Sequence, residues 1–140
     1  MLRSHRRAAS PIVIWLLCAQ LMACGVAVAN EQITVQALAA QLEQSELGQV
    51  SAPLILDVRS PQEYAQGHIP GAINIDYREI LGQIETIRAF NSPEIILYCE
   101  RGVRAGVAER TLAEAGVESV QLAGNIRAWR KAGLPLETGH

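Results

Sequence analysis

Cysteine is scarce in this 140-residue sequence, and its positions limit the chemistry that the chain can support. Of its three cysteines, Cys18 and Cys24 fall in the N-terminal stretch, and Cys99 lies far from them. If that stretch is removed, Cys99 is the single thiol and no intramolecular disulfide can form. One cysteine with His68 and His140 cannot complete a closed zinc site. We therefore predict neither a metal nor another cofactor.

The sequence also has no excess of basic over acidic residues. The sequence has 12 basic and 14 acidic residues, a formal net charge of −2. Arg3, Arg6 and Arg7 lie in the N-terminal stretch, and without them nine basic residues face the same 14 acidic ones, a net charge of −5. A nucleic-acid-binding surface needs a basic face. No nucleic-acid partner is predicted.

The N-terminal stretch has the organisation of a secretory signal. A basic segment with Arg3, Arg6 and Arg7 precedes an apolar run at 12–23, and Ala27-Val28-Ala29 fits an Ala-x-Ala cleavage site. The run is short for a membrane span of ~20 residues, which disfavours an uncleaved anchor. We predict a cleavable signal over 1–29, a single domain over 30–140 and a periplasmic location.

Residues 21–25, Leu-Met-Ala-Cys-Gly, leave one alternative to simple cleavage. They resemble a bacterial lipoprotein box with Cys24 as the lipidated residue. In that case the protein would be anchored to the membrane through Cys24. Membrane association is expected only in that form.

Apolar runs that suit buried strands alternate with segments of helical spacing along the rest of the chain. Strands are expected at 54–58, 73–75, 95–98 and 119–122, and helices at 35–43, 61–64, 78–89, 105–115 and 125–132. Residues 30–34 are interpreted as a short lead-in, and no strand is assigned to them. Because the strand runs are continuously apolar, they favour a parallel sheet. The fold class is therefore α/β, with a central, mostly parallel sheet flanked by helices.

The segment from Ile95 to Ala105 is the most informative part of the sequence. A buried strand ends at Cys99, a short polar loop with Gly102 follows, and a helix begins near Ala105. A loop that opens onto a helix start directs backbone N–H groups inward, and Arg101 and Arg104 add positive charge. Such surroundings favour the thiolate form of a cysteine. Cys99 is therefore the candidate nucleophile.

The loop resembles the Cys-x-x-Gly-x-Arg active loop of the rhodaneses, with Cys99, Gly102 and Arg104 at the matching positions. The chain is similar to the exported, single-domain bacterial members of that family. Two further stretches resemble the family's motifs in the same order: Leu56-Asp57-Val58-Arg59 with Glu63-Tyr64 and residues 67–72, and Leu122 to Trp129 with Gly133-Leu134-Pro135. Asn125 stands where the family usually has a second glycine, and a left-handed backbone is expected there, because asparagine tolerates that conformation better than most residues.

The resemblance implies a thiosulfate sulfurtransferase. Cys99 would take the outer sulfur of thiosulfate as a persulfide and pass it to a thiophilic acceptor, either cyanide or a thiol. The loop residues would bind the donor, with Arg104 at its sulfonate end: Glu100, Arg101, Gly102, Val103 and Arg104. Glu100 is expected to face solvent, because an inward carboxylate would oppose anion binding.

Asp57 and Arg59 lie at the carboxyl end of another expected strand, so they are expected at the same sheet edge as Cys99. An ion pair that supports the loop is favoured over a direct catalytic role for these two residues. His68 lies in a turn with Gly67 and Pro70, which favours a structural histidine over a general base.

Two other functions remain open at this point. Cysteine phosphatases also have a cysteine-led loop ending in arginine, but they place five residues between the two, whereas four separate Cys99 from Arg104. A non-catalytic domain that carries sulfur or binds a partner is the other alternative. The retained Cys99 favours an enzyme over such a domain.

Overall fold

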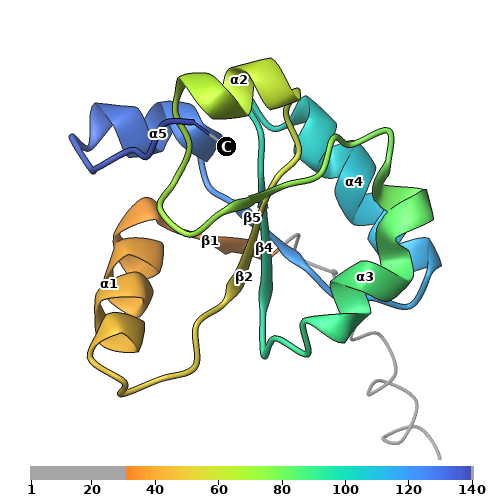
Figure 1. The fold of residues 1–140 in the computed structure, drawn as a ribbon, viewed down its shortest axis with the longest axis horizontal. Coiled ribbons are helices and arrows are strands. Elements are labelled where there is room, and N and C mark those ends of the chain that lie inside the picture. Colours follow the sequence, from red (N-terminus) through yellow and green to blue (C-terminus); the bar gives the residue numbers. More distant parts are fainter. Residues whose placement is uncertain (1–30, 140) are drawn as a thin grey trace, which may run out of the picture.

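The computed structural model describes residues 31–139 and arranges them as one parallel sheet covered by helices on both sides (Figure 1). The predictions for residues 1–29, including the signal and lipidation at Cys24, lie outside the described residues. Within the described part, no helix is both long and apolar enough to cross a membrane.

The sheet has the strand order β1-β5-β4-β2-β3, and every pair is parallel. Its strands are β1 Gln32–Ile33, β2 Leu54–Asp57, β3 Ile73–Asn74, β4 Ile95–Tyr98 and β5 Val120–Leu122. The helices are α1 Val35–Glu46, α2 Pro61–Gln66, α3 Ile84–Ala89, α4 Val103–Glu114 and α5 Asn125–Lys131, with a 3-10 helix, η2, at Ile80–Gln83. The predicted α/β class with a parallel central sheet is confirmed.

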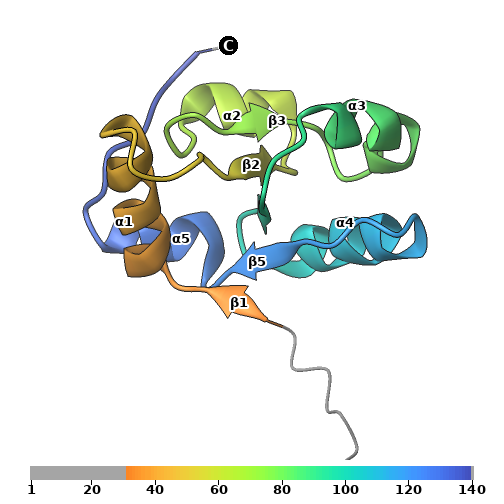
Figure 2. The ribbon, with the colours of Figure 1, turned by 90° about the horizontal axis from the view of Figure 1, so that it is seen from below.

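The two central strands divide the core into two layers, because alternate residues of a strand face opposite sides of a sheet. Leu56 and Leu97 pack on the side of η2, α3 and α4. Ile55 and Ile96 pack on the other side, against α1 and α5. Figure 2 shows these two helix layers on opposite sides of the strands. The continuous apolar runs reflect burial on both faces.

Two elements differ from the sequence predictions. The lead-in contains β1, which is only two residues long and pairs with β5 near the far end of the chain. The helix expected over 78–89 starts as η2 and becomes α-helical only at Ile84. The carboxylate of Asp76 accepts a hydrogen bond from the Arg78 N–H at 3.0 Å, which favours a turn there, and Gly82 weakens the α-helix that would follow.

The strand register brings the predicted site residues to one edge of the sheet. Asp57, the last residue of β2, lies opposite Tyr98, the last residue of β4. Cys99 and Arg59 therefore both emerge from the carboxyl ends of neighbouring parallel strands. In open α/β sheets this edge is where ligands bind.

The turn into α5 gives a first prediction. Gly124 has φ +70°, and a Cβ there would lie 2.6 Å from the Cβ of Ala128. Gly124→Ala should lower the free energy of unfolding by about 1–2 kcal/mol for the left-handed backbone and a further ~1–3 kcal/mol for overpacking. Gly116→Ala is the matched control, because Gly116 has φ +74° and open space around it. Equal losses in urea denaturation of the two variants would contradict the predicted clash.

Candidate active site

Cys99 lies at the floor of a hollow of about 350 Å³ at the carboxyl edge of the sheet. Its side chain is buried, with the residue only 1% exposed. The N–H of Gly102 donates a hydrogen bond to the Cys99 sulfur at 3.0 Å. The wall of the hollow is formed by the loop and the first turn of α4: Glu100, Arg101, Val103 and Arg104. A ligand must therefore enter this small hollow to reach the sulfur.

Gly102 has the backbone conformation that turns the loop into α4. Its φ is +101°, and a Cβ at this position would lie 3.2 Å from the side-chain nitrogen of Asn125. Glycine therefore suits the position for two reasons, one conformational and one steric. α4 begins directly afterwards at Val103, and the first N–H groups of a helix have no acceptor within it. They are available to an anion in the hollow.

Arg104 forms an ion pair that sequence analysis did not predict. Its Nη1 and Nη2 donate to the two carboxylate oxygens of Glu63 at 2.6 and 2.8 Å. Glu63 is held in turn by the N-terminal cap of α2, where it accepts hydrogen bonds from the backbone N–H and the hydroxyl of Ser60. The Ser-x-x-Glu spacing is the signature of such a capping box. It therefore signals the cap, but not the pairing with Arg104.

The ion pair orients Arg104 without using all of its donors. A guanidinium has five N–H groups, and Glu63 accepts two of them. The Glu63 carboxylate raises the pKa of Arg104, and the Cys99 side chain makes a smaller contribution in the same direction. A fixed cation is thus maintained on the wall of the hollow.

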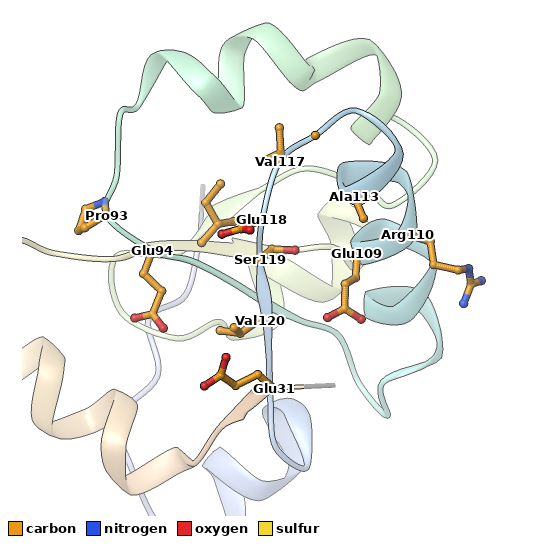
Figure 3. Close-up of a pocket in the computed structure, with 12 residues that line it drawn as sticks. Glu31, Pro93, Glu94, Glu109, Arg110, Ala113, Val117, Glu118, Ser119 and Val120 are labelled. Atoms are coloured by element: carbon orange, nitrogen blue, oxygen red, sulfur yellow. The ribbon is translucent and has the colours of Figure 1, made fainter. Parts of the chain in front are cut away.

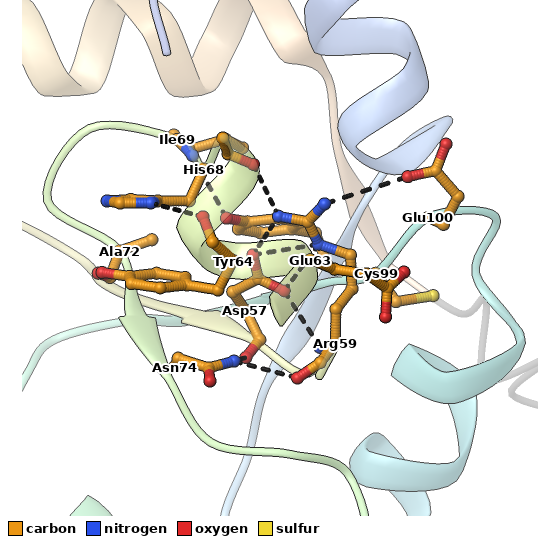
Figure 4. A network of polar contacts seen from close by, with 12 residues as sticks. Asp57, Arg59, Glu63, Tyr64, His68, Ile69, Ala72, Asn74, Cys99 and Glu100 are labelled. Atoms are coloured by element: carbon orange, nitrogen blue, oxygen red, sulfur yellow. Dashed lines mark hydrogen bonds and ion pairs between the residues drawn. The ribbon is translucent and has the colours of Figure 1, made fainter. Parts of the chain in front are cut away.

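Asp57 and Arg59 form a buried ion pair beside this hollow (Figure 4). The Nε of Arg59 lies 2.9 and 3.0 Å from the two Asp57 carboxylate oxygens, and its Nη2 donates to the Gly67 carbonyl at 2.8 Å. The side chain of Asn74 donates to the backbone carbonyls of both residues. The structure thus places Asp57 and Arg59 in a support network rather than on the wall of the hollow.

Glu100 and Arg101 follow Cys99, but their surroundings differ. The carboxylate of Glu100 accepts hydrogen bonds from Arg130 of α5 at 3.0 and 3.2 Å and lies 3.9 Å from Arg59. The expectation that Glu100 faces solvent is therefore met only in part, since its side chain is 33% exposed and paired. Arg101 is exposed, and no ion pair joins it to any residue within 31–139.

Asn125 is a site residue that sequence analysis assigned only to backbone geometry. Its φ of +55° confirms the expected left-handed conformation. Its side-chain oxygen also accepts a hydrogen bond from the Cys99 N–H at 2.9 Å, and the next residue, Ile126, donates its N–H to the Cys99 carbonyl. Asparagine is one of the few residues that adopt the left-handed conformation and supply an acceptor. The start of α5 thereby fixes the backbone of the candidate nucleophile.

His68 is held within its own part of the fold. Its Nδ1 lies 3.0 Å from the Tyr64 carbonyl, and its ring stacks on Tyr64 with 3.6 Å between ring centroids. Its Nε2 lies 3.6 Å from a carboxylate oxygen of Glu137. Both ring nitrogens thus face groups other than Cys99, as expected of a structural histidine.

A larger hollow, of about 800 Å³, lies at the opposite edge of the sheet, where β4 and β5 begin. Figure 3 shows carboxylates of Glu31, Glu94 and Glu118 around it. None of the described residues that line it is a cysteine or a histidine, so the smaller hollow at Cys99 is the better candidate for group transfer. Across residues 31–139, no group of three or more His, Cys, Asp or Glu residues is arranged to hold a metal ion.

Comparison with known proteins identifies the family. The rhodanese-like domain family matches residues 34–132, and the chain therefore belongs to this family. The chain is 36% identical over 72 residues to thiosulfate sulfurtransferase PspE of Escherichia coli, which covers 51% of this chain and 69% of that protein.

Two other similarities place the domain in wider contexts. An HTH-type transcriptional regulator of Mycobacterium tuberculosis, Rv0324, is 37% identical over 100 residues, which covers 70% of this chain but only 42% of the regulator. A structure described as rhodanese with anions from E. coli superimposes with a TM-score of 0.53 at 33% identity, covering 63% of this chain and all of that one. This chain is thus similar both to a protein named as a sulfurtransferase and to part of a protein named as a transcriptional regulator.

The link between Asn125 and Cys99 gives a second prediction. Asn125→Gly keeps the left-handed backbone accessible but leaves the buried Cys99 N–H without its acceptor. The free energy of unfolding should fall by roughly 1–3 kcal/mol in urea titrations. Asn91→Gly is the control, because Asn91 also has positive φ but is exposed. A loss of the same size in both variants would show that the hydrogen bond contributes nothing.

Glu63 gives a prediction about pH. The hydrogen bonds from Arg104 are the main cause that lowers the pKa of Glu63 to about 2 from an ordinary 4.5. The pair should stabilise the folded state fully above pH 4.5 and lose this effect as the pH falls toward 2. Carboxyl NMR should show a midpoint near 2 that rises toward 4.5 in Arg104→Gln but not in Arg110→Gln. An unshifted midpoint in Arg104→Gln would rule out Arg104 as the cause.

Proposed function

We propose that this protein is a thiosulfate sulfurtransferase that works through a persulfide on Cys99. The main support is the position of the Cys99 sulfur at the floor of its hollow. The sulfur accepts a hydrogen bond from the Gly102 N–H at 3.0 Å, and Arg104 forms part of the wall of the hollow. Sulfur transfer needs a nucleophilic sulfur whose negative charge is stabilised by fixed donors.

In the first half-reaction, the Cys99 thiolate attacks the outer sulfur of thiosulfate. A bond forms between the two sulfurs, the bond from the outer sulfur to the sulfonate group breaks, and sulfite leaves with the electron pair. Arg104 binds the sulfonate end through N–H groups that Glu63 does not use. The amides of the loop and of the first turn of α4, residues 100–104, stabilise the negative charge on the transferred sulfur.

In the second half-reaction, cyanide or a thiolate attacks the outer sulfur of the persulfide. The bond to the Cys99 sulfur breaks, its electron pair returns to Cys99, and thiocyanate or a new persulfide leaves. No oxidant or reductant is consumed. The two steps predict ping-pong kinetics, since sulfite leaves before the acceptor reacts.

We also propose that the protein is exported to the periplasm after removal of residues 1–29, with lipidation at Cys24 as the alternative. The apolar run at 12–23 and the Ala27-Val28-Ala29 site support this proposal. The mature chain would then have Cys99 as its single thiol, which simplifies the test of the mechanism.

The full-length gene product should be purified after expression in a bacterium and incubated with thiosulfate. Intact-mass analysis should show a chain beginning at Asn30 that gains one sulfur atom, whereas Cys99→Ser should gain none. Thiosulfate:cyanide activity should fall at least ~1000-fold in Cys99→Ser. Measurable activity in that variant would contradict the assignment, and hydrolysis of a chromogenic phosphate ester in its place would favour the phosphatase alternative.

A further inference from the structure

The basic residues without an ion pair are unevenly distributed within residues 31–139. Nine basic side chains lie within residues 31–139, and five of them form ion pairs: Arg59, Arg78, Arg88, Arg104 and Arg130. The other four have no ion pair with any described residue: Arg101, Arg110, Arg127 and Lys131. Three of these four, all except Arg110, line one hollow.

This cationic hollow has a volume of about 550 Å³ and lies between the Cys99 loop and α5. Arg101 comes from the loop, and Arg127 and Lys131 come from consecutive turns of α5. Gly124, which has no side chain, and Ala128, whose side chain is a methyl group, complete the lining. The three cations therefore surround a space of the size that small-molecule ligands occupy.

The cationic hollow adjoins the hollow at Cys99. Arg101 lines both of them. The first two residues of α5 are hydrogen-bonded to the backbone of Cys99, which fixes the helix that presents Arg127 and Lys131 relative to the sulfur. A molecule held in the cationic hollow would therefore lie beside the entrance to the Cys99 hollow.

Local charge in this region is opposite to that of the whole domain. The domain has a net charge of −5 without the N-terminal stretch, so its overall field repels anions. Glu100, the acidic residue nearest in sequence to Arg101, is paired with Arg130, and no ion pair joins the three cations to any residue within 31–139. Like charges placed together without a counter-ion repel one another, and an anionic ligand would relieve this repulsion.

We propose that the cationic hollow binds the sulfur acceptor, and that this acceptor is a small thiol with two or more carboxylates. This inference rests on the proposed sulfurtransferase function. The carboxylates would pair with Arg101, Arg127 and Lys131 while the thiolate reaches the persulfide. The thiolate attacks the outer sulfur, the bond to Cys99 breaks, and the electron pair returns to Cys99.

The acceptor preference tests this assignment. The persulfide is formed with thiosulfate, and turnover is measured with mercaptosuccinate, which has two carboxylates, and with 2-mercaptoethanol, which has none. Rates are expressed per thiolate at constant ionic strength, so that differences in thiol acidity cancel. Mercaptosuccinate should have a kcat/KM roughly tenfold higher, and added salt should reduce this advantage. Equal values for the two thiols would overturn the proposal.

A matched set of variants assigns the effect to the hollow. The double variant Arg127→Gln with Lys131→Gln should remove most of the preference for mercaptosuccinate. Arg110→Gln is the control, because Arg110 is also an exposed, unpaired cation but lies beside the larger hollow at the opposite edge of the sheet. A preference that survives in the double variant, or is lost equally in the control, would overturn the proposal.

A binding measurement separates this inference from the proposed function. If the wild-type protein releases no sulfite from thiosulfate, the sulfurtransferase assignment fails. The hollow is then judged by titrating the protein with mercaptosuccinate and recording backbone amide NMR shifts. Saturable shifts over residues 124–131 that disappear in the double variant would support an anion site there, and their absence in the wild-type protein would overturn it.

Discussion

The start of α5 holds both backbone groups of Cys99, and the geometry of the candidate site depends on this contact. Asn125 accepts the Cys99 N–H, and Ile126 donates to the Cys99 carbonyl. Without these bonds, a loop that leaves the sheet would have buried polar groups without partners. With them, the loop is fixed between the end of β4 and α5, and the Gly102 N–H donates its hydrogen bond to the Cys99 sulfur.

Charged side chains around the site serve different purposes. Asp57 and Arg59 are buried together and support the loop from behind, in the arrangement that an interior ion pair requires. Glu63 orients Arg104 but leaves part of its guanidinium available. Arg127 and Lys131 of α5 are exposed and form no ion pair with any residue within 31–139. From the interior of the fold to its surface, the charged groups are thus the buried Asp57–Arg59 pair, then the partly buried Arg104, and then the exposed cations without an ion pair.

Several features of the site follow from residues close together in sequence. The apolar runs before Asp57 and Cys99 predicted buried parallel strands, because only strands covered on both faces are apolar throughout. The parallel sheet then implied that Asp57, Arg59 and Cys99 share one edge. The spacing of Cys99, Gly102 and Arg104 located the loop, since a strand, a glycine turn and a helix start are all local structures.

Other features depend on contacts between distant residues. The sequence by itself determined the α/β class, the position of the candidate nucleophile and the left-handed backbone at Asn125, because periodicity and backbone preference act over a few residues. Only the tertiary structure decided that β1 pairs with β5, that Arg104 pairs with Glu63, and that Arg101 gathers with the cations of α5. The partners of Arg104 and Cys99 lie 41 and 26 residues away, and no local pattern specifies which charge or acceptor a folded chain brings together over such separations.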